Sequence, residues 1–217
     1  LQDALDENAR LQEEIANLTM ENAQLQQERY ELESLRELYE IDETTSDYEK
    51  TGARVIASDA TNWFYSFTID KGSDDGIEVD MNVIAGGGLV GRVVSVGPNY
   101  ARVLSIIADN SNVYGTVLTT SANLLVSGNL QSVMTDGVIS FEQLSDRENQ
   151  VQSGDKVVTS NISSKYLPDI PIGYIASIET AANNMTKYGT ITPAVDFQHL
   201  QEVLVILEKK QQVTDEE

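Results

Sequence analysis

The chain has 217 residues and a formal net charge of −21, from 14 Lys and Arg against 35 Asp and Glu. Phosphate backbones repel a chain this acidic, so we expect no nucleic acid as a partner. Polybasic stretches that would bind an anionic membrane surface are also missing. Because Cys is absent, disulfides, thiol nucleophiles and zinc–thiolate sites are excluded.

The first forty residues have the pattern of a coiled coil. Leucines recur every seven residues, and no Gly or Pro interrupts residues 1–39. Leu at the d positions favours a two-stranded parallel coil, and an Asn at an a position pairs with its copy only in register, at a cost in stability. We therefore predict a helix over residues 1–42 that forms a weak parallel homodimer. The predicted dimer seam consists of Asn8, Leu11, Ile15, Leu18, Asn22, Leu25 and Leu32. The alternative is a lone amphipathic helix that packs on its own β domain.

After a polar, acidic joint at residues 42–50, the pattern changes to short strands with turn residues between them. Many short strands at regular spacing indicate small antiparallel barrels rather than βαβ units, and no convincing helical stretch separates them. The predicted strands are residues 54–57, 65–70, 82–85, 89–96, 102–107, 113–119, 124–127, 138–141, 156–159, 173–178, 190–193 and 202–206.

We predict a mainly β fold: an N-terminal α-helical coiled coil followed by two small antiparallel β-barrels. Residues 77–96 resemble residues 151–178, since each segment has an Asp-containing turn, a Val-rich strand and a Gly-led strand. This similarity suggests a duplication with a boundary near residue 121. The predicted barrels are residues 50–120 and 121–210, although terminal strands could cross between them.

Four blocks of the sequence resemble the family of the rod-shape-determining protein MreC, in the order that family has them. They are residues 61–84, 88–104, 154–160 and 193–206. The resemblance implies a bitopic bacterial protein with one transmembrane helix, a coiled coil and two extracytoplasmic β-barrels. It also implies a scaffold of the cell-elongation machinery that contacts MreD and class B penicillin-binding proteins, without cofactor or metal. The loop at residues 160–165 is rich in Ser and Asn where relatives often have Gly, so its contacts are not carried over.

The chain has no run of eighteen apolar residues, so no segment of it is predicted to span a bilayer. It begins at Leu1, inside the heptad pattern and without an initiator Met, so we expect a membrane anchor upstream. The strong acidity favours the extracytoplasmic surface of a Gram-positive cell.

A chymotrypsin-like serine hydrolase is one alternative, because small barrels resemble that fold. A Ser-His-Asp triad needs a His as general base, and the only candidate is His199, with no Ser-centred signature beside it. Residues 153–156 match S-x-x-K, but in a predicted β-turn and after the K-T-G at residues 50–52, which reverses the usual order. A second alternative, the periplasmic adaptor of an efflux system, needs a second heptad stretch, which is absent. We therefore predict no enzyme activity.

One hypothesis about a metal site and one about partner contacts remain to be considered. Asp70, Asp74 and Asp75 lack the spacing of a calcium loop and fit a surface turn better. For partner contacts, apolar residues in a long loop and adjacent aromatics are the best candidates, because such side chains carry most interface energy. We predict that the loop residues protrude. The candidates are Tyr166, Leu167 and Ile170, followed by Trp63 and Phe64.

Overall fold

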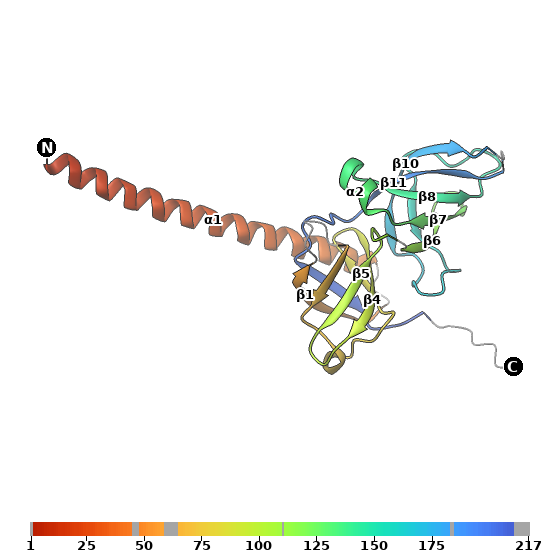
Figure 1. Cartoon of the computed structure of the whole chain (residues 1–217), viewed down its shortest axis with the longest axis horizontal. Coiled ribbons are helices and arrows are strands. Elements are labelled where there is room, and N and C mark those ends of the chain that lie inside the picture. The colour runs from red at the N-terminus through yellow and green to blue at the C-terminus, as the bar shows by residue number, and fades with distance from the viewer. Residues whose placement is uncertain (1, 45–47, 59–64, 110, 183–184, 211–217) are drawn as a thin grey trace. The chain divides into compact units, whose positions relative to one another are not determined.

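The computed structural model describes residues 2–44, 48–58, 65–109, 111–182 and 185–210. Contacts divide the chain into two compact units, Leu1–Glu37 and Leu38–Glu217. The first unit belongs to α1 (Gln2–Thr44), and the second contains two closed six-stranded antiparallel barrels. This architecture confirms the predicted fold class (Figure 1).

Helix α1 runs for 43 residues, about 65 Å at 1.5 Å per residue. Its sequence supports this length, since Gly and Pro are absent. Side chains one turn apart reinforce the helix: Gln24 donates to Glu28 at 3.0 Å, and Gln26 donates to Asn22 at 3.3 Å.

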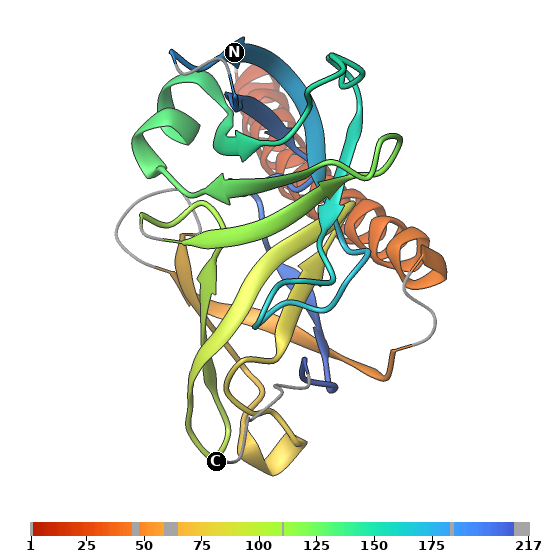
Figure 2. The same ribbon diagram turned by 90° about the vertical axis from the view of Figure 1, so that its right-hand side faces the viewer.

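Barrel one closes in the order β1-β12-β3-β4-β5-β2. Its last strand in the sequence, β12, pairs with β1 on one side and β3 on the other. The dark blue C-terminal strand therefore lies among the orange and yellow strands of this barrel (Figures 1 and 2). The strands are β1 (Lys50–Ser58), β2 (Ser66–Ile69), β3 (Asn82–Ala85), β4 (Gly88–Val96), β5 (Ala101–Ser105) and β12 (Glu202–Ile206), with a 3-10 turn, η1 (Ser73–Asp75), between β2 and β3.

Barrel two closes in the order β10-β11-β8-β7-β6-β9. Its strands are β6 (Asn112–Val117), β7 (Asn123–Ser127), β8 (Ile139–Leu144), β9 (Lys156–Thr159), β10 (Pro171–Thr180) and β11 (Lys187–Pro193). Each of the twelve predicted strands overlaps an observed one. The boundary predicted near residue 121 falls after β6, which belongs to barrel two, and the return of β12 to barrel one is a crossing of a terminal strand that the sequence left open.

One helix within the barrel region was not predicted. Helix α2 (Leu130–Asp136) lies between β7 and β8. Its ends carry the expected chemistry: the Asn129 side chain accepts from Ser132 N at 3.0 Å, and Gly137 ends the helix with φ of 69°. Seven residues are too few for a helical hydrophobic period to stand out, so only these caps signal the helix.

The two barrels share one cyclic strand order. Starting from β12, barrel one reads β12-β3-β4-β5-β2-β1, and starting from β6, barrel two reads β6-β9-β10-β11-β8-β7. The six strands of barrel two are consecutive in the sequence, from β6 to β11. In barrel one the strand equivalent to β6 is β12, which comes after all the strands of barrel two. The barrels are therefore related as two copies of one unit with a circularly permuted connection.

Local hydrogen bonds support the duplication. Asp80 N donates to Val93 O and Val93 N to Met81 O, both at 2.9 Å; Gly154 N donates to Ile175 O at 2.8 Å and Ile175 N to Asp155 O at 2.9 Å. Both turns have a positive φ, at Asp80 and Gly154. The sequence similarity of the two segments thus corresponds to one repeated turn.

The Gly-led strands of the two copies also match in packing. A Cβ on Gly91 of β4 would lie 2.1 Å from Leu104 O, and one on Gly173 of β10 would lie 2.1 Å from Thr192 O. Both glycines allow a neighbouring strand to approach closely, so any side chain here would force the ladder apart.

Barrel two contains a buried ion pair. Lys187 Nζ lies 2.7 Å from Asp146 Oδ2, and the two side chains are 11% and 4% exposed. Asp146 also accepts hydrogen bonds from the backbone N–H groups of Gln150 and Val151, which fixes the loop before β9. Burial raises the pKa of Asp146, but the hydrogen bonds from Lys187 and these two N–H groups outweigh it and hold the pKa below its ordinary value of 3.8.

We predict that Lys187→Met lowers the free energy of unfolding by about 3–5 kcal/mol, because it leaves a buried carboxylate without its counter-charge. Since the folded-state pKa of Asp146 is depressed, its contribution to stability is complete above the unfolded pKa near 3.8 and is lost as pH falls through the folded pKa. Asp146→Asn removes this part of the pH dependence. Urea unfolding between pH 2 and pH 7 measures both effects.

Lys71→Met is the matched control, since Lys71 pairs with Asp75 in a partly exposed surface turn. Its cost is expected to be much smaller, because ion pairs at the surface contribute little to stability. Equal costs for the two lysine variants would contradict the assignment of a structural role to the buried pair.

Candidate functional site

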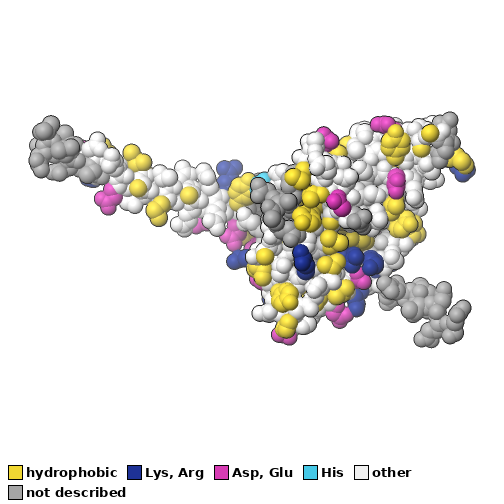
Figure 3. All heavy atoms as spheres, viewed as in Figure 1, with side chains coloured by type: hydrophobic (Ala, Val, Ile, Leu, Met, Phe, Trp, Pro, Cys, Tyr) yellow, Lys and Arg dark blue, Asp and Glu magenta, His cyan; other side chains and the backbone are white. Residues whose placement is uncertain are grey.

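The predicted dimer seam lies along the outside of α1. Leu11, Ile15, Leu18, Leu25 and Leu32 are between 45% and 63% exposed in the chain, and Asn8 and Asn22 are exposed as well. In the space-filling view, the hydrophobic side chains of the helix form an interrupted row (Figure 3). A row of large apolar residues at heptad spacing, on an otherwise polar helix, can bury its surface by pairing with a second helix.

The loop between β9 and β10 differs from its prediction. We expected Tyr166, Leu167 and Ile170 to protrude, but they are 4%, 7% and 0% exposed. All three belong to the hydrophobic core cluster. The expectation of protruding anchors is therefore wrong, because a loop between two adjacent barrels can bury its apolar side chains against both.

Asn82 of barrel one ties down this loop of barrel two. Its Nδ2 donates to Lys165 O at 2.9 Å and to Asp80 O at 3.3 Å, and its Oδ1 accepts from Leu167 N at 2.7 Å. The Asn82 side chain is buried, and these bonds satisfy both ends of its amide. The Asn82 side chain therefore makes the hydrogen bonds to the backbone of Lys165 and Leu167 that a neighbouring strand would otherwise make.

Two further side chains, Thr159 and Tyr166, hold the loop between β9 and β10 in place. Thr159 Oγ1 donates to Leu167 O at 2.6 Å and accepts from Ile170 N at 2.9 Å, which closes the loop on its own barrel. Burial raises the pKa of the Tyr166 hydroxyl, and the positive charge of Arg92, on β4 of barrel one, acts in the opposite direction. The loop thus holds the two barrels together.

Trp63 and Phe64 lie outside the described residues. Exposed apolar side chains occur on both barrels, and on barrel two Tyr114, Leu118 and Tyr174 are each at least 44% exposed. Leu118 N donates to Lys156 O at 2.9 Å, and Tyr174 pairs in register with Lys156. Leu118 and Tyr174 therefore lie on either side of Lys156 of β9, on the outer face of the barrel. We call Tyr114, Leu118 and Tyr174 the barrel-two apolar row.

The alternation of inward-facing and outward-facing residues along a strand could have identified Tyr114 and Leu118 from the sequence. Val113, Gly115 and Val117 point into barrel two and are buried, so Tyr114 and Leu118 point out. The strand predicted at residues 113–119 overlaps β6, but its two faces were not assigned from the sequence. We favoured the apolar loop instead, for which no periodicity distinguishes inside from outside.

The motifs that suggested a hydrolase have structural roles. His199 Nδ1 lies 2.7 Å from Asp196 Oδ2, three residues away, and both side chains are more than half exposed. Ser153 Oγ donates to Ile175 O and Ala176 O from the turn before β9, so S-x-x-K opens a strand rather than a helix. Asp75 accepts from Gly72 N and pairs with Lys71 in the turn that the sequence suggested.

Among the described residues, no group of three or more His, Asp or Glu side chains could hold a metal ion. No helix there combines the length and apolar composition that crossing a membrane requires.

We predict that Asn82→Ala lowers the free energy of unfolding by about 2–4 kcal/mol, because Lys165 O and Leu167 N lose a buried partner. Asn112→Ala, which removes an exposed side-chain bond to Ser127, should cost less than about 1 kcal/mol. Thermal unfolding measures both variants. Matching losses would contradict the role of Asn82 in the junction.

Comparison with known proteins places this fold in one family. The model of the rod shape-determining protein MreC, barrel core, matches residues 55–207. The cell shape-determining protein MreC of Listeria monocytogenes is 31% identical over 208 residues, which cover 95% of this chain and 66% of that protein. This chain therefore spans about two thirds of that relative.

Solved structures agree. The structure of MreC from Listeria monocytogenes has a TM-score of 0.68 and 27% identity, covering 99% of this chain and 98% of its own. MreC in a complex with penicillin-binding protein PBP2 from Helicobacter pylori has a TM-score of 0.56 and 10% identity, covering 73% of this chain and 98% of its own, a likeness of fold alone. The family match spans both barrels, and the chain belongs to the MreC family of rod shape-determining proteins.

Proposed function

We propose that this chain is a non-enzymatic, dimeric scaffold of the bacterial cell-elongation machinery, which organises peptidoglycan synthesis and cell shape outside the membrane. The observation that carries the proposal is the exposed heptad seam of α1 together with two barrels whose interiors are filled by side chains. A filled small barrel leaves its outer surface, rather than its centre, for recognition.

Several features support a binding role over a catalytic one. The pair formed by His199 and Asp196 lies on an exposed turn, where water competes with any proton transfer. The Ser153 hydroxyl is engaged by two backbone carbonyl groups. A serine hydrolase would need these groups in one water-excluding site. The efflux-adaptor alternative has no support from the family match.

The proposed partner is a class B penicillin-binding protein. The Helicobacter pylori MreC, which shares this fold, was solved in a complex with PBP2, and we extend that kind of partner to this chain. Contact with MreD follows from the family resemblance alone. Because the apolar loop residues Tyr166, Leu167 and Ile170 are buried, we assign docking to the barrel-two apolar row. Acidic surroundings favour a neutral or basic partner surface.

We place the protein on the extracytoplasmic face of the cytoplasmic membrane, in a Gram-positive cell. We propose a membrane anchor on the family resemblance alone. Anchoring raises the effective concentration of the helices and offsets the weak pairing that the a-position residues Asn8 and Asn22 allow.

We predict that the isolated chain forms a parallel dimer that dissociates at concentrations on the order of micromolar. Asn22→Leu should tighten the dimer and loosen its register, because an apolar a residue pairs in more than one alignment. Sedimentation equilibrium gives the association constant. Because the chain lacks Cys, disulfide formation in a Leu18→Cys variant reports the register.

Asn17→Leu is the matched control, since Asn17 is exposed at a c position of the heptad and should leave association unchanged. Monomers at all concentrations, in both the natural chain and Asn22→Leu, would overturn the dimer.

We predict that Leu118→Ala with Tyr174→Ala weakens binding to the extracytoplasmic region of a class B penicillin-binding protein by about fivefold or more. Stability should change little, because both side chains are about half exposed. Calorimetric titration and thermal unfolding provide the two measurements.

Ile56→Ala with Tyr100→Ala is the control, because these exposed residues lie on barrel one. If this pair weakened binding as much as the barrel-two pair, docking would not be specific to the barrel-two apolar row. If neither pair had an effect, that row would be excluded as the interface.

A further inference from the structure

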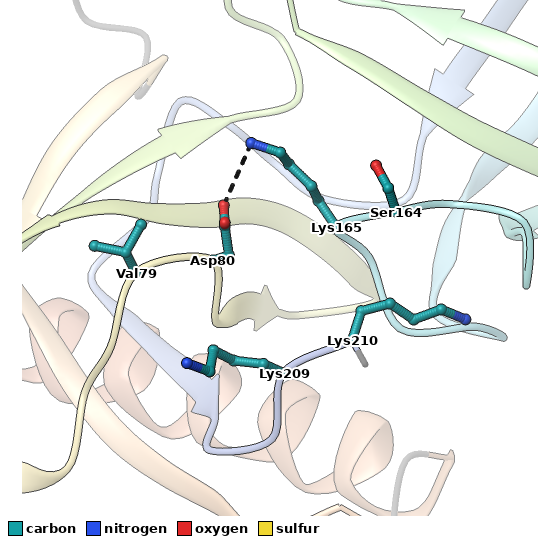
Figure 4. A pocket seen from close by; sticks show the side chains of 6 residues that line it. All are labelled: Val79, Asp80, Ser164, Lys165, Lys209 and Lys210. Atoms are coloured by element: carbon teal, nitrogen blue, oxygen red, sulfur yellow. Dashed lines mark ion pairs between the residues drawn. The ribbon is translucent and has the colours of Figure 1, made fainter. Parts of the chain in front are cut away.

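A pocket of about 350 Å³ lies where barrel one meets the loop between β9 and β10. Two of its walls come from barrel one: the turn before β3 and the segment that follows β12. The third wall is the loop from barrel two (Figure 4). The lining residues are Val79, Asp80, Ser164, Lys165, Lys209 and Lys210.

The charge of this pocket is opposite to that of the chain. Residues 50–217 carry 20 acidic and 11 basic side chains, a net charge of −9. Around the pocket, four cationic groups meet two carboxylates, which gives a local excess of two positive charges. The cations are Lys165, Lys209, Lys210 and Arg92, and the carboxylates are Glu78 and Asp80.

The present partners hold these lysines weakly. Asp80 Oδ1 lies 2.6 Å from Arg92 but 3.7 Å from Lys165, so Arg92 is its main partner. Lys210 donates to the neutral carbonyl of Asn161 at 2.8 Å. Lys209 pairs with Glu78, and both side chains are exposed. Exposed pairs of this kind contribute little, so the ammonium groups can turn to another anion at small cost.

The backbone under the lysines is better fixed than their tips. Lys165 O accepts from Asn82, and the next two residues of its loop are buried. Leu207 N, two residues before Lys209, donates to Glu49 O at 2.8 Å. In Figure 4 the amines of Lys165, Lys209 and Lys210 point in different directions, so a ligand would draw them together by side-chain rotation, which is fast at a surface.

We propose that this pocket binds a compact phosphate-bearing ligand and thereby bridges the two barrels. Lysine acts as a point charge that suits phosphate, whereas recognition of a planar carboxylate uses the arginine fork, and here Arg92 is occupied by Asp80. The Ser164 hydroxyl supplies a neutral donor. The acidic barrels repel an anionic bilayer, so the ligand is a small or polymer-borne phosphate that enters the pocket.

Titration of the full chain with pyrophosphate, at constant ionic strength, tests the site by calorimetry and thermal unfolding. We expect saturable binding, and a melting temperature that rises as the site fills, because the ligand contacts both barrels. Lys165→Gln with Lys210→Gln should weaken binding by about fivefold or more. The matched control is Lys71→Gln with Lys156→Gln, two lysines outside the pocket, which should bind as the natural chain does.

Vesicles that contain phosphatidylglycerol distinguish the source of the phosphate. We expect no vesicle binding; binding that the pocket variant abolishes would keep the phosphate site but identify a lipid headgroup as its ligand. The proposal is overturned if pyrophosphate shows no saturable binding up to about 10 mM. It is also overturned if the control pair weakens binding equally, or if citrate binds as tightly as pyrophosphate.

Discussion

Closure of barrel one by β12 is the constraint on which the rest of the structure depends. Because β12 pairs with both β1 and β3, the chain must return to its first barrel after it has completed the second. Barrel two is thus a contiguous insertion held at both ends by barrel one, whose strands come from both sides of it in the sequence. In return, the connections before β6 and after β11 keep the two copies of the repeated unit adjacent.

That adjacency explains why the loop between β9 and β10 is buried. An apolar loop on an isolated barrel would expose Tyr166 and Leu167 to water, whereas here Asn82 pairs with its backbone and the core takes its side chains. The buried amide is fully hydrogen-bonded, so it adds specificity to the junction without the cost of an unsatisfied group. The proposed phosphate site uses the same fixed backbone, with lysines on its outer side.

These features fit a protein that acts by holding surfaces in place. The heptad seam offers a dimer contact, and the barrel-two apolar row offers a docking surface on a rigid scaffold. Acidity of the remaining surface limits unspecific association with other anionic molecules. A local excess of positive charge therefore directs an anionic ligand to this one pocket, because the acidic surface elsewhere repels it.

The sequence by itself determined α1 and the twelve strands, though not α2: the uninterrupted heptads predict α1, and period two with turn residues predicts the strands, because these patterns report local geometry. It could not determine which strands close which barrel, since β12 is as apolar as its neighbours and pairs with residues about 150 positions away. Nor could it show that Tyr166, Leu167 and Ile170 are buried, because an irregular loop has no period that separates inside from outside. Only the tertiary structure, through the return of β12 and the side chain of Asn82, decided which apolar residues became core and which remained available to a partner.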